Sequence, residues 1–151
     1  MQKITPFLWF NDQAEEAANY YVSIFNNSKI TEVTRAGDQV TFVSFELDGR
    51  AYMALNGGPY YSLTPAFSLF VNCADQAEVD SLWQRMIADG GEESRCGWLV
   101  DKFGLSWQIV PQGLNELLYG PDSAGSQRAV QAMLQMSKLD LAAIQAAYDG
   151  D

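Results

Sequence analysis

The sequence contains no histidine. Histidine is the side chain that most often transfers protons near neutral pH, and it is the commonest metal ligand. A cysteine nucleophile activated by histidine is therefore excluded. Only aspartate, glutamate, cysteine and tyrosine remain as candidates for proton transfer.

Cysteines and long apolar runs are also scarce. Cys73 and Cys96 are the only cysteines, which is too few for a disulfide framework and favours a reducing compartment. No run of 18 uncharged apolar residues could cross a bilayer, and residues 1–6 lack the pattern of a signal peptide. We therefore expect a cytoplasmic protein.

Basic residues are outnumbered. Nine Lys and Arg face 19 Asp and Glu, for a net charge of −10. This charge argues against nucleic acid or an anionic membrane as a partner, and it would suit a cationic ligand. Solubility alone is the simpler explanation of the acidity. The 151 residues, 48% of them hydrophobic, are enough for one compact unit or two small fused modules.

An internal repeat organises the chain. Asp12-Gln13-Ala14-Glu15 recurs 63 residues later as Asp75-Gln76-Ala77-Glu78, each time between an apolar strand and a helix. Gly49 and Gly104 precede matching strands with an offset of 55. Each half therefore predicts a β-α-β-β-β module, and the second is eight residues shorter, which we place in its middle hairpin.

The residue pattern predicts the elements of each module and a helical tail. Residues 3–10 should form a strand buried on both faces, with Asn11-Asp12 capping a helix over 13–26. Asp48-Gly49 indicates a hairpin. The predicted domains are 1–111, made of modules at about 1–58 and 65–111, and a tail over 112–151. The expected remaining strands cover 30–35, 40–47, 51–55, 67–71, about 93–100 and 105–110, and the tail helices cover 114–118, 126–136 and 140–148. The tail should pack on the sheet edge or on a partner subunit.

The stretch from Cys96 to Pro111 carries the most specific signal. It reads Cys-Gly-Trp-Leu-Val-Asp-Lys-Phe-Gly-Leu-Ser-Trp-Gln-Ile-Val-Pro and predicts two strands joined by a turn at Asp101–Gly104. Together with the paired modules it resembles the vicinal oxygen chelate superfamily, and within it the PhnB-like branch catalogued as a "3-demethylubiquinone-9 3-methyltransferase" domain. The resemblance covers about residues 3–111. It implies an α+β fold in which two modules form a half-barrel around a central pocket, and it implies a homodimer.

The resemblance also assigns the positions at which metal-using members hold their ion. They fall on Thr5 and Met53 in the first module and on Ser68 and Gln108 in the second. None of the four is a carboxylate, imidazole or thiolate, so they make a poor site for a divalent ion. We therefore expect neither a metal nor another cofactor.

Strand alternation extends this set to a predicted ligand site. Phe7 and Trp9 should face the same way as Thr5, and Leu55 the same way as Met53. The full predicted site is Thr5, Phe7, Trp9, Met53, Leu55, Ser68, Phe70, Ser106 and Gln108, with Ala51 and Val110 beside them. Such an aromatic and aliphatic lining with a few neutral polar groups is typical of a small-molecule pocket. The same residues could instead fill a closed core.

Three other features allow two interpretations each. Cys96, next to Arg95, is either a nucleophile or a strand cysteine packed under Trp98. Asp101 and Lys102 form either a polar pair at the pocket mouth or part of a turn. The loop over residues 57–61, with two glycines and two tyrosines, either closes over a ligand or simply links the modules.

The leading hypothesis is a metal-free small-molecule-binding protein whose ligand is apolar or aromatic and could be cationic. The alternative is a metal-independent enzyme, which could be of the methyltransferase type that the branch name suggests. A Rossmann-type methyltransferase would have a glycine-rich turn leading from a strand into a helix. The sequence shows no such turn, because Gly90-Gly91 follows a helix instead of preceding one. A third hypothesis is an interaction module that recruits a partner through its tail. The expected partners are a second copy of the chain and a small organic molecule.

Overall fold

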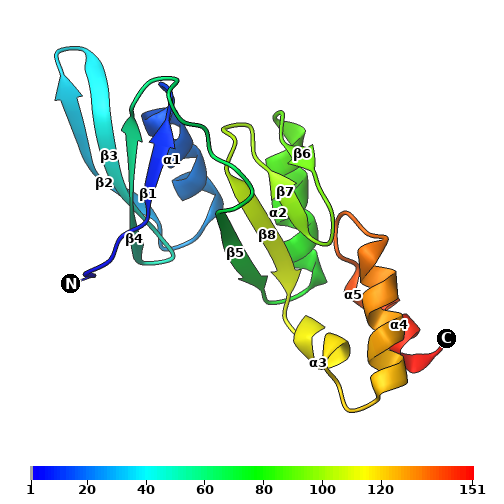
Figure 1. The fold of residues 1–151 in the computed structure, drawn as a ribbon. Coiled ribbons are helices and arrows are strands. Elements are labelled where there is room, and N and C mark those ends of the chain that lie inside the picture. The colour runs from blue at the N-terminus through cyan, green and yellow to red at the C-terminus, as the bar shows by residue number, and fades with distance from the viewer. Residues whose placement is uncertain (1) are drawn as a thin grey trace. The chain divides into compact units, whose positions relative to one another are not determined.

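The computed structural model describes residues 2–151 and divides into two compact units (Figure 1). The first ends at Thr64, and the second spans Pro65–Asp151. Each unit contains one open, four-stranded mixed sheet with helices. The predicted α+β class and the two β-α-β-β-β modules are confirmed. Within residues 2–151, no helix combines the length and the apolar character needed to cross a membrane.

The first sheet has the strand order β1-β4-β3-β2. β1 runs parallel to β4, and the other neighbours are antiparallel. The two strands β2 and β3 form the long hairpin of this module. The elements of the first unit are β1 (Phe7–Phe10), α1 (Ala14–Ile24), β2 (Lys29–Ala36), β3 (Gln39–Leu47) and β4 (Arg50–Asn56).

The second sheet repeats this topology with the order β5-β8-β7-β6. Its outer hairpin, β6 and β7, is much shorter than β2 and β3, which confirms the predicted place of the eight-residue deletion. The elements are β5 (Ser68–Cys73), α2 (Gln76–Ala88), β6 (Glu92–Glu93), β7 (Trp98–Val100) and β8 (Ser106–Pro111), followed by the tail helices α3 (Leu114–Leu118), α4 (Ser123–Leu134) and α5 (Leu141–Asp149).

The first strand is shorter than predicted and is buried on one face only. Leu8 and Phe10 are buried under α1, whereas the side chain of Phe7 is 53% exposed. The backbone ladder ends at Pro6, whose carbonyl accepts from Met53 N–H at 2.9 Å. The side-chain amide of Gln2 then bonds both the N–H and the carbonyl of Ala51, at 3.0 Å each. A side chain thus takes the place of the strand backbone, and Thr5 lies outside the strand.

The two repeated helices begin differently. Asp75 caps α2, accepting from Glu78 N–H at 2.9 Å. The predicted cap of α1 at Asn11-Asp12 is wrong. The Ala14 N–H instead donates to Asn56 Oδ1 at 2.8 Å. The side-chain NH2 of Asn56 donates to the carbonyl of Val40 at 3.1 Å. The end of β4 therefore fixes both the start of α1 and the start of β3.

Each sheet packs one face against its helix. In the first unit α1 buries Ala14, Ala17, Ala18 and Tyr21 against Leu8, Val43, Phe45 and Ala54. In the second unit α2 buries Val79, Leu82, Trp83 and Met86 on the face formed by Leu99, Trp107 and Ile109. Because strand side chains alternate, every second residue points to the opposite face of its sheet, which we call the far face.

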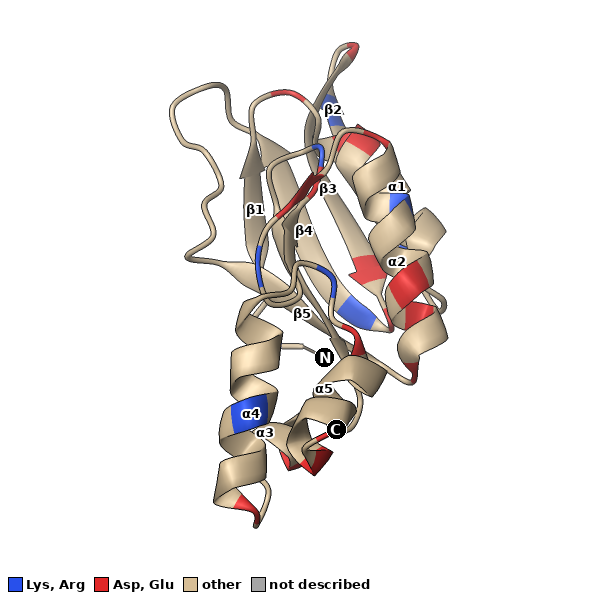
Figure 2. Ribbon diagram, turned by 90° about the vertical axis from the view of Figure 1, so that its right-hand side faces the viewer, with Lys and Arg blue, Asp and Glu red and all other residues tan. Residues whose placement is uncertain are grey.

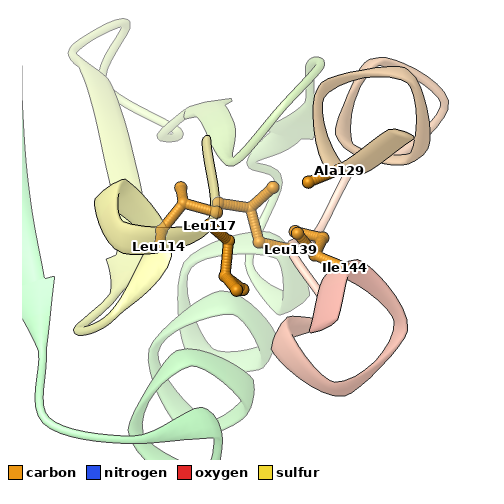
Figure 3. Packing of buried hydrophobic residues seen from close by; sticks show 5 residues of the cluster. All are labelled: Leu114, Leu117, Ala129, Leu139 and Ile144. Carbon is orange, nitrogen blue, oxygen red and sulfur yellow. The ribbon is translucent and has the colours of Figure 1, made fainter. Parts of the chain in front are cut away.

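The tail packs within the second unit, around a small apolar cluster of its own (Figure 3). Asp122 caps α4 by accepting from Gly125 N–H at 3.1 Å, so this helix begins three residues before the predicted start. The cluster consists of Leu114, Leu117, Ala129, Leu139 and Ile144. Val110 of β8 packs against it, which joins the tail to the end of the sheet.

Candidate functional site

The far face of the first sheet carries an apolar cross-strand ladder. Phe7 on β1 lies opposite Met53 on β4, and Met53 lies opposite Ser44 on β3. One step along the strands, Trp9 lies opposite Leu55, which lies opposite Phe42. Two aromatic–aliphatic rows therefore cross three strands, with one hydroxyl among them.

The far face of the second sheet has the same layout with more polar groups. Ser68 on β5 lies opposite Ser106 on β8, and Phe70 lies opposite Gln108. β7 completes the two rows, because Val100 pairs with Ser106 and Trp98 with Gln108. The Gln108 amide donates to Ser68 Oγ at 3.0 Å, which holds the amide across the two strands.

Ser106 has the most unusual polar group of this face. Its side chain is 1% exposed, and within residues 2–151 its hydroxyl is a buried group without a hydrogen-bond partner. A buried hydroxyl left unpaired costs about 1–3 kcal/mol, so most such groups in folded proteins have a partner.

The predicted site residues fall into two sets. Phe7, Trp9, Met53 and Leu55 share the far face of the first sheet, and Ser68, Phe70, Ser106 and Gln108 share that of the second. Thr5, predicted to lie in the strand beside Phe7, precedes β1 and is half-buried. That the two sets line one central pocket stays a prediction.

Sequence reasoning missed the residues that the neighbouring strands add. Phe42 and Ser44 on β3, and Trp98 and Val100 on β7, lie in the same rows as the predicted residues. The alternation of residues 40–47 already placed Phe42 and Ser44 on one face. Trp98 could have been found by pairing the two strands across the 101–104 turn.

The loop over residues 57–61 packs against Trp9. The indole N–H of Trp9 donates to the carbonyl of Gly58 at 3.0 Å, and the ring of Tyr61 stands edge-on to it with 4.9 Å between centroids. Gly57 lies so close that a Cβ there would be 2.3 Å from the ring. The loop therefore fixes the orientation of Trp9, while Tyr60 and Tyr61 stay exposed.

Charged residues are rare on the strands that carry these rows. β1, β5, β7 and β8 contain none, and Figure 2 shows β1 and β5 without charge. By register, Glu46 lies between Ala51 and Lys29 toward the edge of the first far face, and Glu92 lies opposite Val100 at the edge of the second. The centres of the two far faces are therefore apolar, with charges of both signs at the edge of the first and a carboxylate at the edge of the second.

The donor atoms on the far faces do not fit a divalent metal ion. Ser68 and Gln108 offer a hydroxyl and an amide that already bond each other, and Met53 offers a thioether. These are weak ligands for the hard or borderline ions that proteins hold with carboxylates and imidazoles. Within the part of the chain that the structure describes, no group of three or more Cys, Asp or Glu side chains could hold a metal.

The cysteines belong to the packing of the fold. Burial, together with the nearby Glu78, raises the pKa of the Cys73 thiol from 9.0 to about 12, so it stays protonated. Cys96 lies in a turn with φ 58°, not in a strand as predicted, and its thiol contacts the carbonyl of Met133 at 3.6 Å. The protonated Cys73 thiol is therefore not an activated nucleophile.

Asp101 is a turn residue rather than part of a pocket mouth. Its Oδ1 accepts from the N–H groups of Phe103 and Leu105 at 2.8 and 3.0 Å, and its Oδ2 accepts from the indole of Trp107 at 2.8 Å. Lys102 reaches Asp89 at 3.6 Å. The carboxylate thus organises the β7–β8 hairpin that carries Trp98 and Gln108.

Comparison with known proteins identifies the family. The model of the family described as 3-demethylubiquinone-9 3-methyltransferase matches residues 2–110. A solved structure described as a putative 3-demethylubiquinone-9 3-methyltransferase, PhnB protein, from Bacillus cereus is 33% identical; the match covers 73% of this chain and 99% of that one, with a TM-score of 0.68. No curated protein is similar enough to count as a match.

Two more distant structures share the fold. A protein from Pseudomonas aeruginosa is 21% identical over 74% of this chain and 98% of its own, with a TM-score of 0.62. The fosfomycin resistance protein FosX from Listeria monocytogenes, solved with Mn(II) and sulfate, is 15% identical over 78% and 95%, with a TM-score of 0.55. The chain belongs to the 3-demethylubiquinone-9 3-methyltransferase family, and it shares its fold with these two more distant structures.

Proposed function

We propose that the chain is a metal-free small-molecule-binding protein whose apolar or aromatic ligand lies against the far face of the second sheet. The observation that carries the proposal is the far face of the second sheet. It combines two aromatic side chains, Phe70 and Trp98, with the fixed amide of Gln108 and the unpartnered hydroxyl of Ser106. A few oriented polar groups in an aromatic surround are typical of small-molecule sites.

The charge distribution favours a cationic member of this ligand class. The chain carries a net charge of −10, and Glu92 lies near the edge of the far face of the second sheet. Glu46 on the first sheet lies opposite Lys29 and adds no net charge there. Aromatic faces such as those of Phe70 and Trp98 attract a cation by about 0.5–2 kcal/mol, the larger value applying where water is excluded. A planar aromatic cation would use both features.

The family description supports an enzyme as the second candidate, metal-independent and of the methyltransferase type. Proton transfer would require a titratable group with a shifted pKa at the site. Burial raises the pKa of Tyr52, whose ring stacks on Phe45 toward α1. Cys73, whose pKa is also raised, lies on the helix side of β5. Asp80 lies on α2, and its pKa is lowered by its hydrogen bonds with Lys138 and Gln76. None of these three lies on a far face, which favours the binding protein.

We further propose that the protein acts as a cytoplasmic homodimer. Phe7 and Phe70 are 53% and 59% exposed in the single chain. Large aromatic side chains that are exposed on a protein surface favour contact with a ligand or a second protein surface. Sedimentation analysis would test the dimer independently of ligand binding.

Native mass spectrometry with metal analysis is the first experiment, on protein purified from its own host. The proposal expects a stoichiometric organic adduct and no stoichiometric metal. A stoichiometric metal would contradict the metal-free assignment. An adduct that the protein methylates when supplied with a methyl donor would establish the enzyme instead.

Binding of the planar aromatic cation proflavine tests the site itself. Replacing Phe70 with alanine should weaken proflavine binding about tenfold, equivalent to about 1.4 kcal/mol. Tyr119→Ala is the matched control, because it removes an 82% exposed ring from the α3–α4 connection. Equal weakening in both variants would contradict the site. The anionic dye 8-anilinonaphthalene-1-sulfonate should bind more weakly than proflavine, and the reverse order would contradict the preference for a cation.

A further inference from the structure

The tail lies outside the region that matches the family model, which ends at residue 110. It nevertheless contacts the second sheet closely. Its apolar cluster includes Leu139 and Leu114. Val110, which lies on the far face near the end of β8, packs against that cluster. Figure 3 shows the five cluster side chains converging from the tail helices and the α4–α5 connection.

The α4–α5 connection is bonded to the turn that precedes β7. The N–H groups of Cys96 and Gly97 donate to the carbonyls of Met136 and Ser137 at 2.9 and 2.8 Å. Leu139 packs on Gly97 so closely that a Cβ there would lie 2.9 Å from its Cδ1. Gly97 in turn accepts from Ile109 N–H at 2.7 Å. The turn is thus held between the tail and β8.

Gln76 fastens the same connection to α2. Its side-chain amide donates to the carbonyl of Leu139 at 2.8 Å and accepts from Leu141 N–H at 2.8 Å. Lys138 adds an ion pair with Asp80 at 2.8 Å. The Gln76 side chain therefore pairs with the tail backbone through both its N–H donor and its oxygen acceptor, as the backbone of a neighbouring strand would.

The internal repeat shows that this role is specific to the second unit. Gln13 occupies the equivalent position of the repeated tetrapeptide, yet its side chain is exposed and its amide reaches Glu16, three residues further along the chain, at 3.5 Å. The same residue at the same place in two modules thus has a long-range structural role in only one of them. The chain supplies its own matched control.

We infer that the tail, held to α2 by Gln76, positions the side chains on the far face of the second sheet, where the ligand is proposed to bind. The turn held by the tail leads directly into Trp98, whose N–H bonds the carbonyl of Arg95 at 3.0 Å. Trp98 shares its row with Gln108 and Phe70. The hydrogen bonds described above join Gln76 and the α4–α5 connection to each other and to the Cys96–Gly97 turn, not to these three site residues. Gln76 therefore acts on the site through the Cys96–Gly97 turn. The statement about the ligand rests on the proposed function; that about Trp98 does not.

The test compares Gln76→Ala with Gln13→Ala in the full-length protein labelled with 5-fluorotryptophan. Gln76→Ala should shift or broaden the fluorine resonance of Trp98, assigned with Trp98→Phe, and leave that of Trp9 unchanged. Amide hydrogen exchange at Leu141, Cys96 and Gly97 should become about tenfold faster, because the bonds that hold the connection are lost. Gln13→Ala should change neither measurement.

Further readouts separate this inference from the proposed function. Proflavine affinity should fall about threefold in Gln76→Ala and stay unchanged in Gln13→Ala, the smaller effect expected of a residue that acts through another. Lys138→Ala, which keeps the amide pairing, should have a smaller effect on Trp98 than Gln76→Ala. A Trp98 resonance unchanged by Gln76→Ala, despite faster exchange at Leu141, would overturn the inference. A wild-type protein that binds no proflavine would count against the cationic ligand and leave the Trp98 test valid.

Discussion

At the scale of single residues, the contact between Gly57 and Trp9 is the most sensitive in the first unit. A Cβ at residue 57 would overlap the indole at 2.3 Å. Gly57→Ala should therefore displace the ring, break its bond to the Gly58 carbonyl and destabilise the protein by about 1–3 kcal/mol. Urea unfolding measures the loss, and a red-shifted tryptophan emission would report the displacement.

A double-variant cycle provides the control for this prediction. In a Trp9→Ala background the obstructing ring is gone, so adding Gly57→Ala should cost less than about 0.5 kcal/mol. An equal cost of Gly57→Ala with and without the ring would show that the backbone, and not Trp9, is responsible.

Individual residues also show where sequence reasoning succeeds and where it stops. Strand alternation and the repeat offsets are local signals, and they correctly predict that Ser68, Phe70, Ser106 and Gln108 share one face. The sequence predicts Thr5 within the first strand, but the Gln2 side chain replaces the strand backbone at Ala51, so β1 begins at Phe7. The Asn56 cap of α1 comes from 42 residues away, and no local pattern announces such a bond.

At the scale of elements, the β7–β8 hairpin depends on the buried carboxylate of Asp101. An Asn side chain has one acceptor oxygen, so it cannot accept from both the turn N–H groups and the indole of Trp107. Asp101→Asn should destabilise the protein by about 2–3 kcal/mol, because a buried donor would face another donor. The shift in the urea midpoint measures this cost.

Asp89→Asn is the matched control for the hairpin prediction. Asp89 is exposed and its ion pair with Lys102 spans 3.6 Å, so the same change there should cost less than about 0.5 kcal/mol. Similar midpoints for Asp101→Asn and the wild type would show that the carboxylate does not hold the hairpin.

Turns in this chain were predictable where their residue types are distinctive. Asp48 and Gly49 take φ values of 50° and 76°, as their hairpin signal indicates, and Gly104 takes 93°. Cys96 at φ 58° was assigned to a strand, because cysteine gives no signal for a left-handed turn. Its conformation is held by bonds from the tail backbone to the Cys96–Gly97 turn, which local sequence cannot reveal.

At the scale of the whole molecule, the two modules share one topology and differ in their attachments. The second module has the shorter outer hairpin and carries the tail, which Gln76 fastens. The repeat predicted the two sheets well because both copies keep the same order of strands and helix. The docking of the tail depends on long-range bonds that the repeat does not encode.

Metal binding also depends on the whole molecule, because the ligand positions that the resemblance assigns come from both modules. A tight divalent site needs three or four strong ligands, and the positions assigned by the resemblance offer Thr5, Met53, Ser68 and Gln108. Introducing two ligands with Thr5→His and Gln108→Glu should still give no tight zinc binding, because Met53 and Ser68 cannot complete the coordination. Isothermal titration checks this, with the wild type as the control. Zinc uptake by the double variant tighter than about 1 μM, equivalent to about 8 kcal/mol, would mean that other side chains complete the site and that the metal-free assignment must be revised.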